Sequence, residues 1–578
     1  MRSNLRIGIL IFLASVAFQS TFITLDAFVS DEGIVLVAAD DVAHGRLLYE
    51  DTSIPLTPVA YLVQGLVFKL FGSSFFVSRM LVCFVNALCA AMVFNLAGRF
   101  LPLRRAAFAG VLAVPLQVWM WPHAQYFSYN QLTVLLCLVA MRVAWSIETG
   151  PSRRNAFAFG CVLAAALWTK PSLPVAVGAG VLLYWMTCWL RSAYGLPCSR
   201  QRGFREILEE GVATLCGIAA ASLPICLYLA SLGILDDVIT SVVKITQIYG
   251  DSPTGLFPSL FPLTGQIDAV RMSTGLVLPG MLINVFEGIG KDPFYHHLVL
   301  FSGWVDLGVR VIYYTPIVLY AATGWVLLGK MKKGGWSAED EAALAVLCAS
   351  LLLYFTNVSF AALHYITPTL LPLAALATFA VTGLTSDTQP RRIRAAIRIS
   401  SRMAVAIYLA GSLAALAAYL AVPRAPVHSP RGTVWVANST AVVWNEILTH
   451  TDAAMDEGDD LFVYPYFPLF HFLSGRDHPS RFIALGPGFP GVETEDEIIA
   501  TLERQRVEFT LNAYAVQYPG LEKFENAYPR LNHYLDTHYD VERSFQETIF
   551  PYADFLKRRP PNSAEPVRDH AVPSPTGS

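Results

Sequence analysis

Two adjacent carboxylates, Asp31 and Glu32, follow directly after the first long apolar segment of the chain. An ionised group beside membrane hydrocarbon is costly to maintain, so such a group is a functional candidate by default. A carboxylate within hydrogen-bond reach of a hydroxyl or amine can remove its proton and activate it as a nucleophile. The alternative is an ordinary solvated loop. We take Asp31 as the candidate general base.

A short helix-like run follows the carboxylates and is broken at Gly45. It leads into a stretch rich in proline and in side chains that could bind a substrate. The residues of interest there are Tyr49, Asp51, Pro55, Pro58 and Tyr61. Further along, Phe71-Gly72 precedes Arg79, a cation that opens the second apolar segment. Carboxylates, hydroxyls and a cation therefore gather beside one boundary of the apolar segments.

Lys170 stands in the sequence Trp168-Thr169-Lys170-Pro171, between two apolar segments. A cation at such a boundary can bind a phosphate group. The alternative is a lysine whose stem lies in the apolar layer while its ammonium reaches the head groups. His364 and Tyr365 open another apolar segment, where a histidine would give a contact that titrates near neutral pH. The alternative for this pair is an interfacial tyrosine beside a capping histidine.

The composition indicates an integral membrane protein. Of 578 residues, 54% are hydrophobic and only 15% are charged, whereas soluble domains have about 45–50% apolar and about 25% charged residues. The net charge of −3 and the lack of a basic stripe exclude a nucleic-acid-binding class. Apolar runs predict eleven spans, or thirteen if a further pair is hidden. They cover residues 5–27, 77–98, 106–121, 129–147, 156–169, 171–190, 211–232, 307–328, 341–358, 365–384 and 403–422.

Clusters of lysine and arginine predict the orientation, because such residues in short loops stay on the cytoplasmic side. The clusters precede the first span and follow the second, fourth, sixth, eighth and tenth spans, so all of them fall on one side. The amino terminus is then cytoplasmic and the carboxyl-terminal part external. The loop 28–61 and the turn 122–128, with His123 and Tyr126 as further substrate-binding candidates, share the external face. The region 233–306 reads as interfacial amphipathic helices.

Beyond residue 422 the spans stop and charged residues become more frequent. We divide the chain into a membrane module (1–422), an external α/β domain (423–557) and a disordered tail (558–578). Helices are expected at 439–449 and 494–505 and strands at 460–464 and 508–511, and such alternation favours an α/β layer domain. The aromatic run Tyr464–Phe470 is a candidate acceptor-facing surface, although packing inside the domain is the favoured interpretation.

The order of residues in the first external loop resembles that of the GT-C polyprenol-phosphate-dependent membrane glycosyltransferases, such as the protein mannosyltransferases and the lipid A aminoarabinose transferase. The resemblance rests on Asp31-Glu32-Gly33, Gly45, Tyr49, Asp51, Pro55, Pro58, Tyr61, Phe71-Gly72, Arg79, the Thr169-Lys170 pair and the His364-Tyr365 entry into a late span. It implies that Asp31 is the base, that Glu32 supports it or binds the acceptor, and that Lys170 and His364-Tyr365 face the lipid phosphate or the sugar.

The resemblance implies an inverting transfer of sugar from a polyprenyl-phosphate monosaccharide to a glycan, lipid or protein acceptor, outside a bacterial inner membrane. Gly33-Ile34 and Ile54-Pro55-Leu56 replace an arginine and a Lys-Pro-Pro stretch of the aminoarabinose transferase, so neither sugar nor acceptor is assigned. The second loop lacks the acid of several relatives, so no metal or other cofactor is expected. A transporter or lipid flippase is the alternative function, although no internal repeat of the kind common in transporters is visible. A third possible function is that of a noncatalytic membrane subunit that shares this fold.

Overall fold

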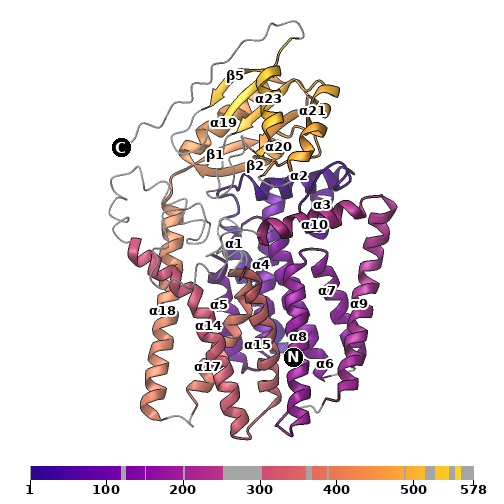
Figure 1. Cartoon of the computed structure of the whole chain (residues 1–578). Helices are drawn as coiled ribbons and strands as arrows, with labels where there is room; N and C mark the ends of the chain where they lie inside the picture. Colours follow the sequence, from indigo (N-terminus) through magenta and orange to yellow (C-terminus); the bar gives the residue numbers. More distant parts are fainter. Residues whose placement is uncertain are drawn as a thin grey trace.

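The computed structural model describes residues 2–118, 125–149, 152–198, 202–250, 302–358, 367–386, 390–486, 490–513, 527–545 and 553–560. Its long helices form a bundle, and a smaller domain that contains the β-strands lies at one end of that bundle (Figure 1). The short helix α2 (Asp31–Ala43), which begins at the candidate base, lies between the two. The arrangement places the first loop under a cover formed by the carboxyl-terminal part of the chain.

Each of the eleven segments predicted to span the membrane overlaps a helix. These helices are α1 (Arg2–Ser20), α4 (Phe75–Ala97), α5 (Leu103–Val118), α6 (Tyr129–Thr149), α7 (Ser152–Leu167), α8 (Ser172–Ala193), α9 (Phe204–Ser231), α14 (Ser302–Lys332), α15 (Ala338–Phe355), α17 (Leu371–Leu384) and α18 (Arg391–Ala421). In the described part of the chain, α4, α6, α8 and α9 are both long and apolar enough to cross a bilayer. The chain is therefore an integral membrane protein, while the number of spans stays a prediction.

Glycine allows two helices of the bundle to approach closely. A Cβ at Gly160 of α7 would lie 2.9 Å from the carbonyl carbon of Thr214 in α9, and a Cβ at Gly217 of α9 would lie 3.0 Å from that of Phe157. Helices in a membrane associate through such small residues, because the lipid supplies no hydrophobic driving force between apolar faces. Reciprocal glycines thus explain why α7 and α9 pack along their length.

The first loop folds as its residues predict. Helix α2 ends at the cap residue His44, and Gly45 then takes a φ of +89°, a left-handed conformation that glycine adopts without a steric penalty. The following segment leads to α3 (Val59–Phe71), which ends at the Phe71-Gly72 pair before Arg79. Of the predicted interfacial region 233–306, the structure describes α10 (Leu235–Gly250) and the start of α14, and residues 251–301 lie outside the described part.

The carboxyl-terminal domain combines an antiparallel hairpin with a four-stranded sheet. The hairpin pairs β1 (Arg424–Ser429) with β2 (Gly432–Ala437). The sheet has the order β3 (Leu461–Pro465), β4 (Phe509–Ala513), β6 (Ala553–Arg558) and β5 (Tyr539–Phe545), and only the β3–β4 pair is parallel. The helices of the domain are α19 (Asn438–Ala454), α20 (Leu469–Ser474), α21 (Glu495–Arg504) and α23 (Pro529–His538). The two helices and two strands predicted from sequence correspond to α19, α21, β3 and β4.

Backbone hydrogen bonds join this domain to the segment just before α2. The amide of Asp26 donates to the carbonyl of Trp435 at 2.7 Å, and the amide of Trp435 donates to the carbonyl of Thr24 at 2.7 Å. At the α2–α20 seam, a Cβ on Gly33 would lie 2.8 Å from Leu469 Cα and nearer still to its backbone nitrogen. The hydrogen at Gly33 is therefore what allows α20 to lie directly on α2.

We predict that Gly33→Ala loosens the α2–α20 seam. The added methyl group fits only if α20 moves, and such overpacking costs about 1–3 kcal/mol. The variant in detergent should melt at a lower temperature, and a protease should cleave its carboxyl-terminal domain faster. Gly211→Ala in α9 is the matched control, because nothing lies within 4 Å of its Cβ position. If both variants melt like the unmodified protein, α2 and α20 do not pack this closely.

Candidate functional site

Asp31 is the first residue of α2, and its carboxylate is half-buried beneath the carboxyl-terminal domain. A carboxylate in the first turn of a helix is favoured by the positive end of the helix dipole. The hydroxyl of Tyr466 donates a long hydrogen bond of 3.5 Å to Asp31 Oδ1. Burial raises the pKa of Asp31 to about 6, against the opposing effects of Tyr466 and of the positive charge of Lys170. The group therefore titrates close to neutral pH.

Lys170 lies in the connection between α7, which ends at Leu167, and α8, whose N-cap residue is Pro171. Its Nζ donates to Asn130 Oδ1 at 2.7 Å and lies 5.5 Å from the ring centre of Tyr129. Burial lowers the pKa of Lys170 to about 7, and the negative charge of Asp31 opposes that change. Asp31 and Lys170 thus carry opposite charges that influence each other at one end of the helical bundle, and the pKa of each lies near neutral pH.

Asn130 and Tyr129 were missed by the sequence analysis. Both begin α6, and the hydroxyl of Ser128 accepts a hydrogen bond from the amide of Asn130 at 3.2 Å. This contact fixes the first turn of α6 beside Lys170. The sequence does contain a signal for the start of α6. A serine just before an apolar run commonly caps a helix by accepting a hydrogen bond from the backbone N–H two residues later. Nothing in the sequence shows that the asparagine faces a lysine forty positions away.

Glu32 and Arg79 form a buried pair. Nε of Arg79 donates to Glu32 Oε1 at 2.6 Å and Nη2 donates to Oε2 at 2.8 Å. Relative exposure is 1% for the glutamate and 0% for the arginine, so water contributes nothing to this contact. Glu32 also accepts from the amide of Phe28 at 2.8 Å, and Arg79 donates to the carbonyl of Asp26 at 2.9 Å. Both side chains are fully engaged inside the protein, where they hold the start of α2 against α4.

The remaining candidates in the first loop hold the loop together. Tyr49 is buried and donates to the carbonyl of Leu56 at 2.6 Å, while the exposed Asp51 accepts from the amide of Leu47 at 2.7 Å. Tyr61 is buried in the hydrophobic core cluster that also contains Tyr49. Tyr126 is buried and stacks on Phe28 at 5.9 Å, two residues after Asp26. His123, His364 and Tyr365 lie outside the described residues.

A second polar cluster lies at the seam and was not expected from the sequence. Asp41 of α2 contacts Nε2 of His478 at 2.8 Å, accepts a hydrogen bond from the hydroxyl of Thr52, and pairs with Arg46 at 3.1 Å. Burial raises the pKa of Asp41, but these three partners outweigh burial and the net pKa lies below its usual range. The cluster fastens the carboxyl-terminal domain to α2 and keeps Asp41 ionised.

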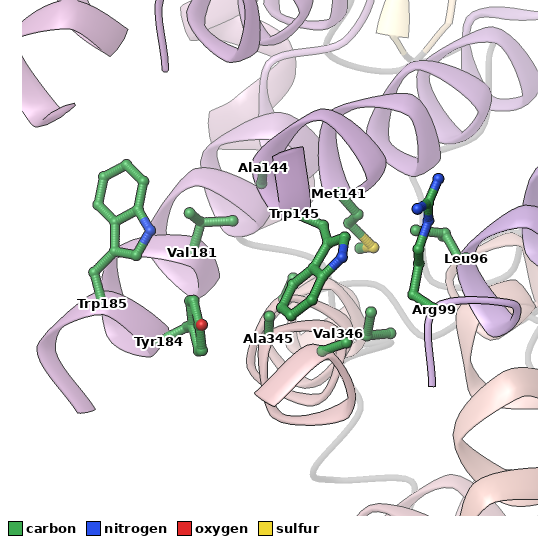
Figure 2. A pocket seen from close by; sticks show the side chains of 12 residues that line it. Leu96, Arg99, Met141, Ala144, Trp145, Val181, Tyr184, Trp185, Ala345 and Val346 are labelled. Atoms are coloured by element: carbon green, nitrogen blue, oxygen red, sulfur yellow. The ribbon is translucent and has the colours of Figure 1, made fainter. Parts of the chain in front are cut away.

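A cavity in the bundle lies far from these groups. Figure 2 shows the side chains that line it, with Trp185 at one side, Trp145 in the middle and Arg99 at the other side. Its volume of about 20 Å³ is room for about one water molecule, and it holds neither a sugar nor a lipid head group. Leu96, on its wall, lies 17 residues beyond Arg79 on α4, which is about 25 Å along a helix. The cavity is separate from the candidate site.

No metal centre is visible in the ranges that the structure covers, because they contain no group of three or more His, Cys, Asp or Glu side chains able to hold an ion. A carboxylate that ionises near neutral pH can accept a proton, and an ammonium at the same boundary can bind an anion. Together they suit a reaction in which an acceptor loses a proton while a phosphate departs.

No family model matches the sequence, and no curated protein matches it. Among solved structures, the fold is similar to that of the Archaeoglobus fulgidus oligosaccharyltransferase in the apo form. That match has a TM-score of 0.50 and 11% identity, and it covers 94% of this chain and 74% of the other. The chain therefore has a fold similar to that of an oligosaccharyltransferase.

Two further structures give similar values. The Archaeoglobus fulgidus oligosaccharyltransferase AglB, in complex with an inhibitory peptide and a dolichol-phosphate, matches with a TM-score of 0.49 and 10% identity over 94% of this chain and 74% of that one. ArnT from Cupriavidus metallidurans in the apo state matches with a TM-score of 0.47 and 12% identity, over 95% of this chain and 97% of that one.

We predict that Arg79→Leu lowers the free energy of unfolding by about 3–5 kcal/mol, because Glu32 is left buried without its partner. Adding Glu32→Leu to this variant should recover much of the loss, since both charges are then gone. Thermal or denaturant unfolding in detergent measures both effects. Arg153→Leu is the control, because its pair with Glu209 is exposed and should matter little. An Arg79→Leu protein as stable as this control would contradict the structural role of the pair.

Proposed function

We propose that this chain is an inverting glycosyltransferase that moves a sugar from a polyprenyl-phosphate monosaccharide to a glycan, lipid or protein acceptor. The transfer takes place on the non-cytoplasmic face of a membrane, which in a bacterium is the inner membrane. The observation that carries this proposal is the placement of Asp31 and Lys170 together at one end of the bundle, each half-buried and titrating near neutral pH. The fold shared with an oligosaccharyltransferase supports the same class of reaction.

Asp31 acts as the general base in this proposal. Inversion requires the acceptor to attack the anomeric carbon from the side opposite the departing phosphate, so one carboxylate must lie on the acceptor side. Burial raises the pKa of Asp31 to about 6, which strengthens the carboxylate as a proton acceptor while leaving it mostly ionised at neutral pH. The proton of the acceptor passes to the Asp31 carboxylate as the new glycosidic bond forms and the sugar–phosphate bond breaks.

Lys170 binds the lipid phosphate. Its Nζ has Asn130 as a fixed partner at 2.7 Å, so the ammonium is held in one place before the donor arrives. A preorganised cation stabilises negative charge that develops on the departing phosphate at low cost in reorganisation. Glu32 and Arg79 act indirectly: their buried pair fixes the helix turn that carries Asp31. His364 and Tyr365 stay candidates for the same phosphate.

We expect Asp31→Asn to abolish transfer. A general base contributes about 100- to 10,000-fold, and an amide cannot accept the proton. Membranes that contain the protein would be supplied with undecaprenyl-phosphate monosaccharides, each carrying a different radiolabelled sugar, and the label recovered in lipid, glycan and protein fractions would be counted. Glu457→Gln, which changes an exposed carboxylate of the carboxyl-terminal domain, should transfer normally. Equal transfer by Asp31→Asn at equal abundance would reject Asp31 as the base.

The pH profile provides an independent test. Asp31 must be ionised to accept a proton, so kcat/KM should fall as the pH drops below about 6. Lys170 must be protonated to hold the phosphate, so kcat/KM should fall again as the pH rises above about 7. Lys170→Arg should remove the alkaline limb, because a guanidinium stays protonated. Lys69→Arg, an exposed position on α3, should leave both limbs in place. A retained alkaline limb in Lys170→Arg would assign it to another group.

A further inference from the structure

The aromatic run Tyr464–Phe470 serves two purposes in the structure. Phe467 and Phe470 are buried and stack with ring centres 4.8 Å apart, and Trp444 of α19 packs edge-on against both. These rings belong to the core that continues from the carboxyl-terminal domain into α2. The packing fixes the turn between β3 and α20. Tyr466, the first residue of that turn, is only half-buried and extends its hydroxyl to Asp31 Oδ1 at 3.5 Å.

The turn is also fixed against the membrane module. The amide of Leu469 donates to the carbonyl of Val29 at 3.2 Å, two residues before Asp31. Gly33, two residues after it, brings the α2 backbone against the start of α20. Contacts on both sides of Asp31 therefore set the position of the Tyr466 hydroxyl relative to the carboxylate. The Tyr466 hydroxyl is therefore held in place by the packing of the protein on both sides of Asp31.

We infer that Tyr466 is a positioning residue of the candidate active site, supplied by the carboxyl-terminal domain, which orients the Asp31 carboxylate for proton abstraction. The inference rests on the proposed function. Its hydroxyl donates to Oδ1 and leaves Oδ2 available for the acceptor's proton. The external domain is then part of the catalytic machinery, and the base is complete only while the α2–α20 seam is closed.

The electrostatic surroundings of Asp31 agree with this role. Tyr466 faces it from the carboxyl-terminal domain and Lys170 from the α7–α8 connection, while the neighbouring Glu32 is neutralised by Arg79 of α4. The hydrogen bond from Tyr466 favours the ionised carboxylate and lowers a pKa that burial raises. Without the phenol, the carboxylate would lose both its orientation and part of the stabilisation of its charge.

Titration of Asp31 in Tyr466→Phe tests the inference without any sugar donor. Dicyclohexylcarbodiimide reacts with protonated carboxyl groups, and mass spectrometry of the full-length protein after digestion reports the modified fraction at Asp31 over a range of pH. In the unmodified protein the labelling should fall as the pH rises through about 6. The hydrogen bond from Tyr466 favours the ionised carboxylate, so the midpoint in Tyr466→Phe should move to higher pH.

Two further variants make the result specific. Tyr466→Met also lacks the hydroxyl and should shift the midpoint in the same direction. Tyr534→Phe, in α23 of the same domain, loses a hydroxyl that accepts from Arg558 at 3.4 Å and does not face α2, so its midpoint should match the unmodified protein. Proteolysis patterns that match the unmodified protein would show that the domain stays docked in each variant. An unchanged midpoint in both Tyr466 variants overturns the positioning role.

The transfer assay separates this inference from the proposed function. If the unmodified protein transfers sugar, the acid limb of kcat/KM should move upward in Tyr466→Phe together with the labelling midpoint, and kcat should fall more than KM changes. If the labelling midpoint moves but the unmodified protein transfers none of the sugars, the contact between Tyr466 and Asp31 is supported and the proposed function fails. If transfer is normal and neither the midpoint nor the acid limb moves, the function stands and Tyr466 has no part in it.

Discussion

The buried pair between Glu32 and Arg79 is the constraint on which the rest of the site depends. Removing two charges from water is costly, and only close geometry with satisfied hydrogen bonds repays that cost. Here both carboxylate oxygens and most of the guanidinium are engaged, with distances of 2.6 and 2.8 Å across the pair. The arrangement tolerates little movement, so the first turn of α2 is fixed to α4 and to the end of the segment that follows α1.

Because Asp31 is the neighbour of Glu32 on the same helical turn, fixing one side chain sets the direction of the other. Successive residues of a helix point about 100° apart, so the glutamate faces α4 while the aspartate faces elsewhere, towards the charge of Lys170 and the hydroxyl of Tyr466. Two adjacent carboxylates thereby take different roles. One is permanently paired inside the protein, and the other titrates near neutral pH at the boundary of the bundle.

Sequence alone predicts the local features well. Apolar runs locate the long helices, Gly45 marks the end of α2, and the position of Lys170 beside Pro171 marks a boundary between helices. Glu32 was predicted to support the base or bind the acceptor and Arg79 to bind the substrate, whereas their pairing with each other was not predicted. The reason is physical: a pairing across 47 positions depends on how α2 and α4 pack, and the residue pattern of either helix is the same whether its charge meets a ligand or a partner.

The contact between Asp31 and Tyr466 spans 435 positions of the chain, and this separation affects how the protein is made. Ribosomes add about 5–20 residues per second, so about 20–90 s pass between synthesis of the carboxylate and of the phenol. During that interval the first loop has been made, while the domain that covers it does not yet exist. The nascent chain therefore carries Asp31 uncovered through most of its translation, and the contact forms only when the carboxyl-terminal domain folds onto the first loop.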